Sequence, residues 1–548
     1  MVDPARLLEA YKIARRDLLA ERGPGGYWIG RLSSSALATA TAASAMSVVL
    51  RHSVHRRSLG DRLELLIAKA VAWLAGCQNA DGGWGDTDKS LSNIATTMLV
   101  IAAFHLAGAA DQHAPLLQRA ARYVESHGGV AGLRRRYGKD KTFAVPILAN
   151  CALAGLVNWR EVSPLPFEMA CLPSAVLGIL RLPVVSYAIP ALVAVGQARY
   201  LFCKPLNPLV RLVRCLTLES SLRKAARMQP ASGGFLEATP LTSFVVMSLA
   251  ASGRAEHPIV RKGIEFLASS AREDGSWPID TNLATWLTTL SINGLAAAGE
   301  NVAELGCLDW LLACQHEEAH PFTEAAPGGW GWSDLPGAVP DADDTSGALL
   351  SLAALRRSSS PYDVSRIDAA AGEGLRWLIN LQNRDGGWPT FCRGWGALPF
   401  DRSGVDLTAH ALRAIHAWRK AAPEVLIDVF QESGRAQRGG PQAVEKHVGC
   451  AVRRGLGFLA ARQRPDGSFI PLWFGNQHDP AEENPIYGTA RALLAYRDLG
   501  LLGTEPAQRG LAFLARRQNP DGGWGSTAEG AGLPAGVSSV EETALALE

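Results

Sequence analysis

A repeating pattern of apolar helices and aromatic turns organises the chain. Residues 68–77 and 374–381 carry apolar side chains at the spacing of one helical face. Each segment is followed by Gln and by an Asp-Gly turn, where a positive φ is tolerated, and then by Trp. The next segment, for example residues 94–106, is again apolar and helical, and the alternation typical of strands is nearly absent. The pattern predicts repeated pairs of helices.

Several copies of this motif recur along the sequence. The clear copies end at Trp84, Trp388, Phe469 and Trp524, and weaker relatives end at Trp28, Phe235, Trp277 and Trp330. We expect each Trp to stack over its turn and each Gln amide to bind backbone groups at a neighbouring helix end. Repeated helix pairs of this kind close into α/α barrels or stack as solenoids, which predicts an all-α fold.

Length, composition and charge narrow the class of protein. A chain of 548 residues is too long for one ordinary core, so two or more domains are expected. The content of 47% hydrophobic and 19% charged residues argues against disorder and fits a large apolar cavity or a membrane-facing patch. The 54 basic residues are scattered and balanced by 52 acidic ones, which gives no case for a nucleic-acid partner. The nine cysteines form no CxxC pair and indicate reduced thiols in the cytosol.

One apolar stretch suggests contact with a membrane surface. Residues 169–195 are interrupted by three prolines and by Arg181, so a membrane-spanning helix is not expected. Lys and Arg flank the stretch, which favours a monotopic contact. We expect residues 164–212 to form part of that contact, although the same residues could equally be buried core. The N-terminus lacks the apolar region of a signal peptide.

An acidic cluster carries the candidate chemistry. The run from Asp341 to Thr345 reads Asp-Ala-Asp-Asp-Thr, which alone is a weak signal because acidic triplets are common on solvated loops and in metal sites. Asp406 and His410 are four residues apart and would share one helical face. Clustered carboxylates can form an unusually strong acid if one stays protonated and a cationic partner offsets the charge of its neighbours.

The Gln-to-Trp repeats, together with Pro340 and the acidic run to Thr345, resemble the squalene–hopene cyclase family of class II triterpene cyclases. The likeness runs from about Gly25 to the last residue, with the motifs in the expected order. It implies an α/α barrel with the catalytic acid, made of residues 1–20 and 270–548. It also implies a second, inserted α/α barrel over residues 21–269. No metal and no organic cofactor are implied.

The resemblance also assigns roles within the acidic cluster. It implies that Asp343 is the proton donor and that Asp341 and Asp344 tune its acidity. His410, with Asp406 one turn before it, would pair with the donor and raise its acidity.

Aromatic residues are expected to line the cavity of such an enzyme, because their rings are apolar and their electron-rich faces stabilise carbocations. Local motifs place five of them at family cavity positions: Trp286, Trp332, Phe391, Trp473 and Tyr187. A further residue, Tyr487, falls where the family keeps a Tyr that resupplies protons through water.

We therefore predict an isomerase (intramolecular transferase) that protonates a terminal double bond of squalene and forms a hopanoid-type pentacyclic triterpene. We expect it to dock peripherally on the cytoplasmic side of the cell membrane, and the family favours a homodimer. Three alternatives stay open: a class II cyclase of another polyprenoid, a non-catalytic member, and a protein prenyltransferase β-subunit. The last would need zinc, with Cys392 and His410 among its ligands, and leaves the acidic cluster unexplained. The sequence ends soon after a helix begins near residue 539, so a C-terminally truncated sequence is expected.

Overall fold

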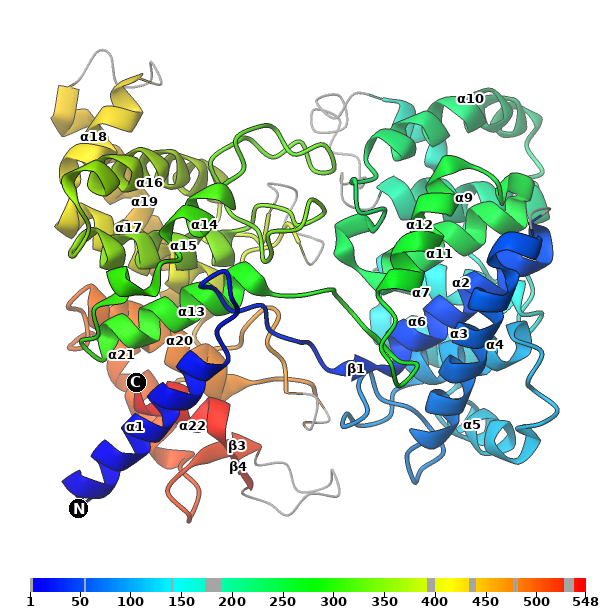
Figure 1. Cartoon of the computed structure of the whole chain (residues 1–548), viewed down its shortest axis with the longest axis horizontal. Coiled ribbons are helices and arrows are strands. Elements are labelled where there is room, and N and C mark those ends of the chain that lie inside the picture. Colours follow the sequence, from blue (N-terminus) through cyan, green and yellow to red (C-terminus); the bar gives the residue numbers. More distant parts are fainter. Residues whose placement is uncertain are drawn as a thin grey trace.

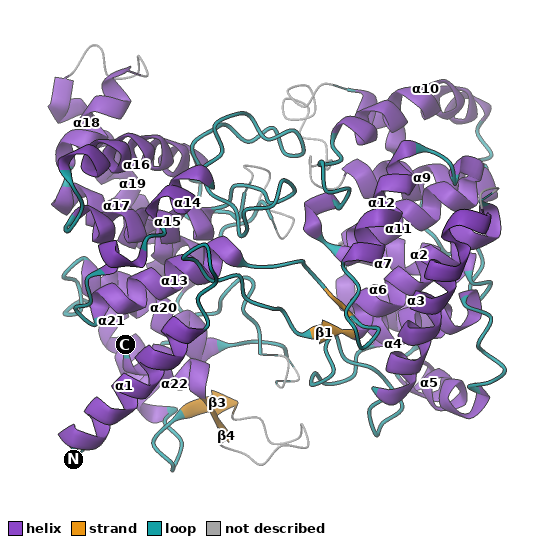
Figure 2. Cartoon of the chain, viewed as in Figure 1, coloured by secondary structure: helices purple, strands orange, loops and turns teal. Residues whose placement is uncertain are grey.

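The computed structural model describes residues 3–53, 56–138, 141–172, 189–391, 400–432, 440–476, 479, 481–526 and 537–548. The chain forms two helical lobes joined by extended segments, and both termini lie in the same lobe (Figure 1). Helices dominate the described residues (Figure 2). Strands form two short antiparallel pairs: β1 (Ser34–Ser35) with β2 (Trp277–Pro278), and β3 (Trp524–Ser526) with β4 (Val537–Ser539). The prediction of an all-α fold is confirmed.

The lobe on the right of Figure 1, which we call the ring lobe, is a closed ring of inner helices with a layer of outer helices around it. The inner helices, in order of contact, are α2 (Ala36–His52), α4 (Ile94–Leu106), α7 (Lys141–Leu153), α9 (Ile189–Phe202) and α11 (Thr239–Leu249), and α11 packs back against α2. The outer elements are α3 (Arg56–Gly76), α5 (Ala114–Ser126), α6 (Gly129–Tyr137), η1 (Phe167–Cys171), α10 (Pro208–Arg227), η3 (Phe235–Glu237), η4 (Ala250–Arg254) and α12 (Pro258–Ser269).

The other lobe carries the acidic cluster, and we call it the acid lobe. Its inner helices pack side by side in the order α13 (Ala284–Ala297), α15 (Ala342–Arg356), α17 (Val405–Ala421), α20 (Pro485–Asp498) and α22 (Val540–Leu547). The remaining elements are α1 (Pro4–Ala20), η5 (Val302–Leu305), α14 (Leu308–Ala313), α16 (Pro361–Leu381), α18 (Pro423–Glu432), α19 (Gly440–Arg462) and α21 (Glu505–Arg516). The N-terminal helix α1 joins this lobe through Arg15, whose Nε donates to the Glu300 carboxylate at 2.7 Å.

The repeated Gln and Trp residues tie each turn to two helices. The Nε2 of Gln382 donates to the carbonyls of Gly386, in its own turn, and of Ala451, in the outer helix α19, at 2.8 and 2.9 Å. The indole nitrogen of Trp388 donates to the carbonyl of Leu378 in the preceding helix at 2.8 Å. The expected binding of Gln to a neighbouring helix is confirmed. Because the Trp side chain is fully buried, its N–H needs this acceptor.

A threonine on the following inner helix completes each repeat, and sequence reasoning missed it. The hydroxyl of Thr408 accepts a hydrogen bond from the backbone N–H of Trp388 at 3.0 Å. Thr345, the last residue of the acidic run, does the same for Trp330 at 3.0 Å. The Thr of that run therefore fastens a turn to α15.

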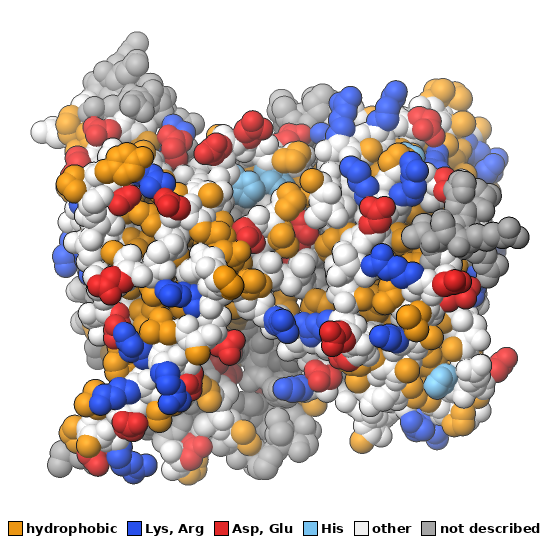
Figure 3. Space-filling view, in the orientation of Figure 1, with side chains coloured by type: hydrophobic (Ala, Val, Ile, Leu, Met, Phe, Trp, Pro, Cys, Tyr) orange, Lys and Arg blue, Asp and Glu red, His pale blue; other side chains and the backbone are white. Residues whose placement is uncertain are grey.

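Charge on the surface is mixed. On the face drawn in Figure 3, basic and acidic side chains are scattered over both lobes without a large region of one sign. This distribution matches the near balance of 54 basic and 52 acidic residues in the sequence. It gives this face no basic stripe of the kind that follows a nucleic-acid backbone.

Candidate active site

The acidic run forms the start of helix α15, and the helix explains why it is acidic. Asp341 is the N-cap, and its Oδ1 accepts the backbone N–H groups of Asp343 and Asp344 at 2.8 and 2.9 Å. An Asp at this position satisfies donors that the helix leaves free, and its charge interacts favourably with the positive end of the helix dipole. All three carboxyl groups are buried. The helix start thus gathers three acids away from water.

Two inner helices bring partners to Asp343. From α17, His410 places its Nδ1 at 2.5 Å from Oδ1 of Asp343. From α20, Arg491 places its Nη2 at 3.5 Å from the same oxygen. Helix α17 packs against both α15 and α20, so the three side chains meet at the centre of the row. The predicted pairing of His410 with Asp343 is present in the geometry.

The environment separates the acidities of the three carboxyl groups. Burial raises the pKa of Asp341 to about 7. Burial and the charges of Asp341 and Asp343 raise the pKa of Asp344 well above its ordinary value. Burial also acts to raise the pKa of Asp343, but His410 and Arg491 outweigh it and hold that pKa below its ordinary value. Two weak acids therefore lie beside a strong one.

His410 and Arg491 are the two groups beside Asp343 that can carry a positive charge. Burial, and then the charge of Arg491, lower the pKa of His410 to about 4, although Asp343 acts in the opposite direction. A proton on Nδ1 makes His410 the hydrogen-bond donor to Asp343. The permanent positive charge belongs to Arg491, which sequence reasoning missed. The available signal was an arginine in the otherwise apolar run after Tyr487.

Asp406 shares a helical face with His410, as its spacing indicates. Its Oδ1 accepts the backbone N–H of Leu472 at 3.1 Å, and its Oδ2 has no partner among the described residues. Burial and the nearby charge of Asp343 raise the pKa of Asp406 to about 6. Asp406 is therefore a fourth buried carboxyl group close to the donor candidate.

A stack of aromatic rings runs from α13 to the acid cluster. Trp286 stacks on Phe474 at 5.2 Å between ring centroids, and Phe474 stacks on Tyr487 at 4.8 Å. The guanidinium of Arg491 lies 5.9 Å from the centroid of Tyr487. Two predicted site residues, Trp286 and Tyr487, are thus joined through Phe474, which the sequence did not single out.

A second aromatic group surrounds Thr390. Phe391 stacks on Phe400 at 4.8 Å, and Phe400 contacts Trp473 at 4.7 Å. The indole nitrogen of Trp473 donates to the hydroxyl of Thr390 at 2.8 Å, and the carbonyl of Thr390 accepts the N–H of Ala342 at 2.7 Å. These contacts tie the group to the first turn of α15.

The other two predicted aromatic residues have different positions. The carbonyl of Trp332 accepts the backbone N–H groups of Thr285 and Trp286 at 3.1 and 3.3 Å, which joins its loop to the start of α13. Tyr187 lies outside the described residues. Trp473 is the most exposed of the described aromatic candidates, with 38% of its surface accessible.

A buried acid, Glu237, and a half-buried one, Asp280, lie where the two lobes meet. The Glu237 carboxylate in the ring lobe accepts hydrogen bonds from the Ser232 hydroxyl at 2.7 Å and from the N–H of Gly337 at 2.8 Å. Gly337 belongs to the loop that leads to Asp341. Burial and Glu237 raise the pKa of the neighbouring Asp280 to about 8. Glu237 thus ties the ring lobe to the acid loop, a role that no sequence pattern indicated.

Two structural features bear on the zinc-dependent alternative and on the membrane. Within the described ranges, no group of three or more His, Cys, Asp and Glu side chains could hold a metal ion. Cys392, the zinc ligand of the prenyltransferase alternative, lies outside those ranges. Of the helices in the described part of the chain, none has the length and apolar character that crossing a membrane requires.

Comparison with known proteins adds a family match over most of the chain. The squalene–hopene cyclase N-terminal domain matches residues 12–188, and the squalene–hopene cyclase C-terminal domain matches residues 282–398 and 434–546. A squalene–hopene cyclase of Bradyrhizobium diazoefficiens is 26% identical over 97% of this chain and 84% of its own length. A terpene cyclase–glycosyl transferase fusion protein of Humicola fuscoatra is 25% identical, and the match covers 95% of this chain but 43% of the fusion protein.

An ent-copalyl diphosphate synthase from Streptomyces platensis aligns with 98% of this chain and 87% of its own, at a TM-score of 0.49 and 19% identity.

Proposed function

The chain belongs to the squalene–hopene cyclase family of class II triterpene cyclases, and we propose that it cyclises squalene to a hopanoid-type pentacyclic triterpene. Reactions of this class start with a proton and rearrange a single molecule, so the enzyme is an intramolecular transferase, or isomerase. The observation that carries the proposal is the buried Asp343 carboxyl, held between His410 and Arg491 with a low pKa.

In the proposed mechanism, the O–H bond of Asp343 breaks and its proton joins the terminal carbon of a double bond. The electron pair of that double bond forms the new C–H bond and leaves a carbocation on the more substituted carbon. The next double bond attacks this cation, and rings close in sequence. The last cation loses a proton or is captured by water. A strong acid is required because an alkene is a very weak base, and the low pKa of Asp343 supplies that strength.

Aromatic rings near the acid suit the cations that follow. The stack of Trp286, Phe474 and Tyr487 offers electron-rich surfaces without nucleophilic atoms on the ring faces. We propose that this stack and the rings around Thr390 line part of the substrate site. Trp332 and Tyr187 belong to the same proposal through their positions in the family pattern.

Each turnover leaves Asp343 without its proton, so the site needs a supply. Asp341 and Asp344 hold protons more firmly than Asp343, so they do not reprotonate it; their protons limit the negative charge of the cluster. Burial raises the pKa of Tyr487 above its ordinary value, so its phenol keeps its proton. We propose that Tyr487 passes protons from water toward this cluster.

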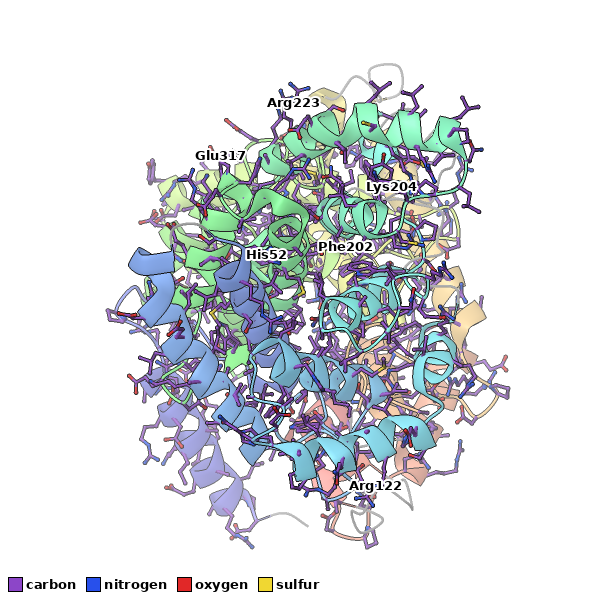
Figure 4. The ribbon with its side chains drawn as sticks, turned by 90° about the vertical axis from the view of Figure 1, so that its right-hand side faces the viewer. His52, Arg122, Phe202, Lys204, Arg223 and Glu317 are labelled. Carbon is purple, nitrogen blue, oxygen red and sulfur yellow. The ribbon has the colours of Figure 1, made fainter. Side chains whose placement is uncertain are left out.

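The substrate is apolar, and we propose that the enzyme takes it from the cytoplasmic face of the cell membrane through the region of α10. One face of α10 exposes Leu209, Leu212 and Leu216, and Leu206 just before the helix is 94% exposed. Basic side chains border this region, among them Lys204 and Arg223 (Figure 4). Exposed apolar side chains rimmed by basic ones are typical of contact with a lipid surface.

This apolar strip overlaps the predicted segment 164–212 and extends beyond it to Leu216. Residues 173–188 of the predicted segment lie outside the described ranges. A homodimer is part of the same proposal, and sedimentation of the purified protein in detergent measures it directly.

One assay tests the proposed function. The purified protein is incubated separately with squalene and with linear C20 to C35 polyprenes, and the products are identified by mass spectrometry. Conversion of squalene to a pentacyclic product supports the proposal. Conversion of another polyprene alone would assign the enzyme to a different substrate of the same class.

The Asp343→Asn variant tests the donor in that assay. We expect turnover to fall below detection, because an amide cannot donate a proton to carbon, while the helical circular dichroism stays unchanged. Asp368→Asn, on the outer helix α16, serves as the control with near-normal turnover. Cyclisation by Asp343→Asn would remove Asp343 from the donor role.

A further inference from the structure

We propose that Arg491 is the fixed positive charge that makes Asp343 acidic enough to protonate a carbon–carbon double bond. This inference rests on the proposed function and assigns a positioning residue to it. Arg491 lies in α20, is 6% exposed, and directs Nη2 toward Oδ1 of Asp343 at 3.5 Å. A guanidinium keeps its proton even when buried, so this charge is present at every working pH.

The surroundings of Arg491 leave Asp343 as its nearest ion-pair partner. On its own helix it faces the ring of Tyr487. On α17 it faces His410 and Asp406, and the carboxylate of Glu548 beyond α22 is more distant. Within the described residues, Asp343 is the carboxylate that lies within ion-pair distance of the guanidinium.

Arg491 strengthens the acid because it interacts differently with the protonated and the ionised form of Asp343. In its reactive, protonated form Asp343 is neutral, and the cation of Arg491 interacts with it only weakly. After transfer Asp343 is an anion, and the same cation stabilises it strongly in a site shielded from water. An interaction that grows as the proton leaves lowers the barrier to transfer. Without Arg491, the carboxylate would be more basic and would recapture the proton from the carbocation.

His410 can add to this charge but does not fix it. Burial and Arg491 lower the pKa of its imidazole to about 4, so its charge varies with pH, whereas that of Arg491 does not. Its hydrogen bond to Oδ1 orients the Asp343 carboxyl group. The two partners therefore have separate tasks: His410 holds the carboxyl group in place, and Arg491 stabilises the charge that develops on it.

The distance of 3.5 Å leaves room for the ion pair to tighten. At this distance Nη2 forms an ion pair with Asp343, but it has no hydrogen bond to any described residue. A donor that is not yet bonded can approach the oxygen as negative charge develops there. Hydrogen bonds of this kind are often long in the free enzyme and shorten in the reacting complex.

The test compares Arg491→Met and Arg491→Lys with two substrates, squalene and its terminal epoxide. An epoxide oxygen is far more basic than an alkene carbon, so it needs a weaker acid. We expect Arg491→Met to lose about 100-fold or more in kcat with squalene and less than about tenfold with the epoxide. Arg491→Lys should recover most of the loss, because it keeps the charge. Equal losses with both substrates would show a merely structural role and overturn the proposal.

A second measurement does not depend on turnover. With ¹⁵N-labelled histidine, we expect His410 to stay neutral between pH 5 and 8 in the native protein. In Arg491→Met its pKa should rise above the native value, because the repulsive charge has gone while the burial that lowers this pKa remains. An unchanged His410 titration in the variant would overturn the proposal even if squalene is not the substrate. If the native protein converts neither compound while His410 responds as expected, the proposed substrate fails and the role of Arg491 stands.

A matched control comes from the other end of the acid helix. Arg356 in α15 forms an ion pair with Asp368 in α16 at 2.6 Å, remote from the acid cluster. Arg356→Met should reduce stability slightly. It should leave unchanged the ratio of the kcat values for squalene and its epoxide, and also the titration of His410.

Discussion

At the scale of single residues, the site assigns different acidities to chemically identical groups. Asp341, Asp343 and Asp344 are neighbours on one helix turn, yet only Asp343 is in contact with both His410 and Arg491. Position around the helix decides this, because residues one apart point in different directions. Asp341 turns back to cap the helix, and Asp343 points toward α17 and α20. Burial is common to all three, so the neighbouring charges make the difference.

The raised pKa of Asp341 makes stability depend on pH. Its pKa is about 7 in the folded protein and near 3.8 in the unfolded chain, so the folded state binds more protons between these values. Stability should therefore fall as pH rises from about 4 to 7, by up to about 1.4 kcal/mol per pH unit from this group. Asp341→Asn keeps a capping side chain and cannot ionise. Urea unfolding at pH 5 and pH 8 should show a smaller difference in the variant than in the native protein. Parallel pH dependence in the two proteins would contradict the assignment.

At the scale of elements, each repeat fastens an outer helix, a turn and an inner helix. In the turn at Trp330, the hydroxyl of Thr345 accepts the backbone N–H and donates to the backbone carbonyl of the same residue. The same turn receives the N–H of Asp341 on its carbonyl at 2.9 Å. The architecture and the acid motif therefore share residues, and damage to the turn should displace the acids.

Thr345→Val tests this link. The substitution keeps the shape and removes the hydroxyl, so the buried N–H of Trp330 loses its acceptor. We expect the free energy of unfolding to drop by about 1–3 kcal/mol, together with a loss of turnover. Thr217→Val in α10 is the control, because that hydroxyl bonds carbonyls of its own helix at the surface. Its stability should change by about 0.5 kcal/mol or less. An equal drop in the free energy of unfolding for Thr345→Val and Thr217→Val would contradict the role of Thr345 in holding the turn.

At the scale of the whole molecule, the two lobes meet close to the acid loop. Glu237 of the ring lobe holds Gly337 of the acid lobe, and Arg136 of the ring lobe pairs with Glu482 of the acid lobe at 2.6 Å. The apolar strip of α10 belongs to the ring lobe, whereas the acids belong to the other (Figure 1). The proposed membrane contact and the proposed chemistry therefore lie in different lobes of one chain.

The α10 strip gives a prediction at this scale. The double variant Leu209→Asp/Leu216→Asp should bind phosphatidylcholine vesicles at least about 100-fold more weakly, because two apolar side chains lose their burial in lipid. Turnover of detergent-solubilised substrate should stay within about twofold of native. Leu65→Asp, at a separate exposed leucine on α3, should bind vesicles normally. Co-sedimentation with vesicles measures the binding. Native-like sedimentation of the double variant would place the membrane contact elsewhere.

The sequence alone determined the features that depend on close neighbours along the chain. Helical spacing, the Gln-to-Trp turns, the capping Asp341 and the shared face of Asp406 and His410 all follow from residues within a few positions of each other. The all-α fold and the family followed from those local patterns.

Tertiary structure alone decided which distant side chains surround Asp343. Arg491 lies 148 positions from Asp343 in the numbering, and Phe474 joins Trp286 to Tyr487 across three separate segments. Such contacts, like that of Glu237 with Gly337, depend on how helices pack, and packing leaves no periodic signal in a single sequence. The low pKa of Asp343 depends on such distant charges, so the sequence pointed to the acidic residues and to His410, but only the packing of α20 brought Arg491 beside them.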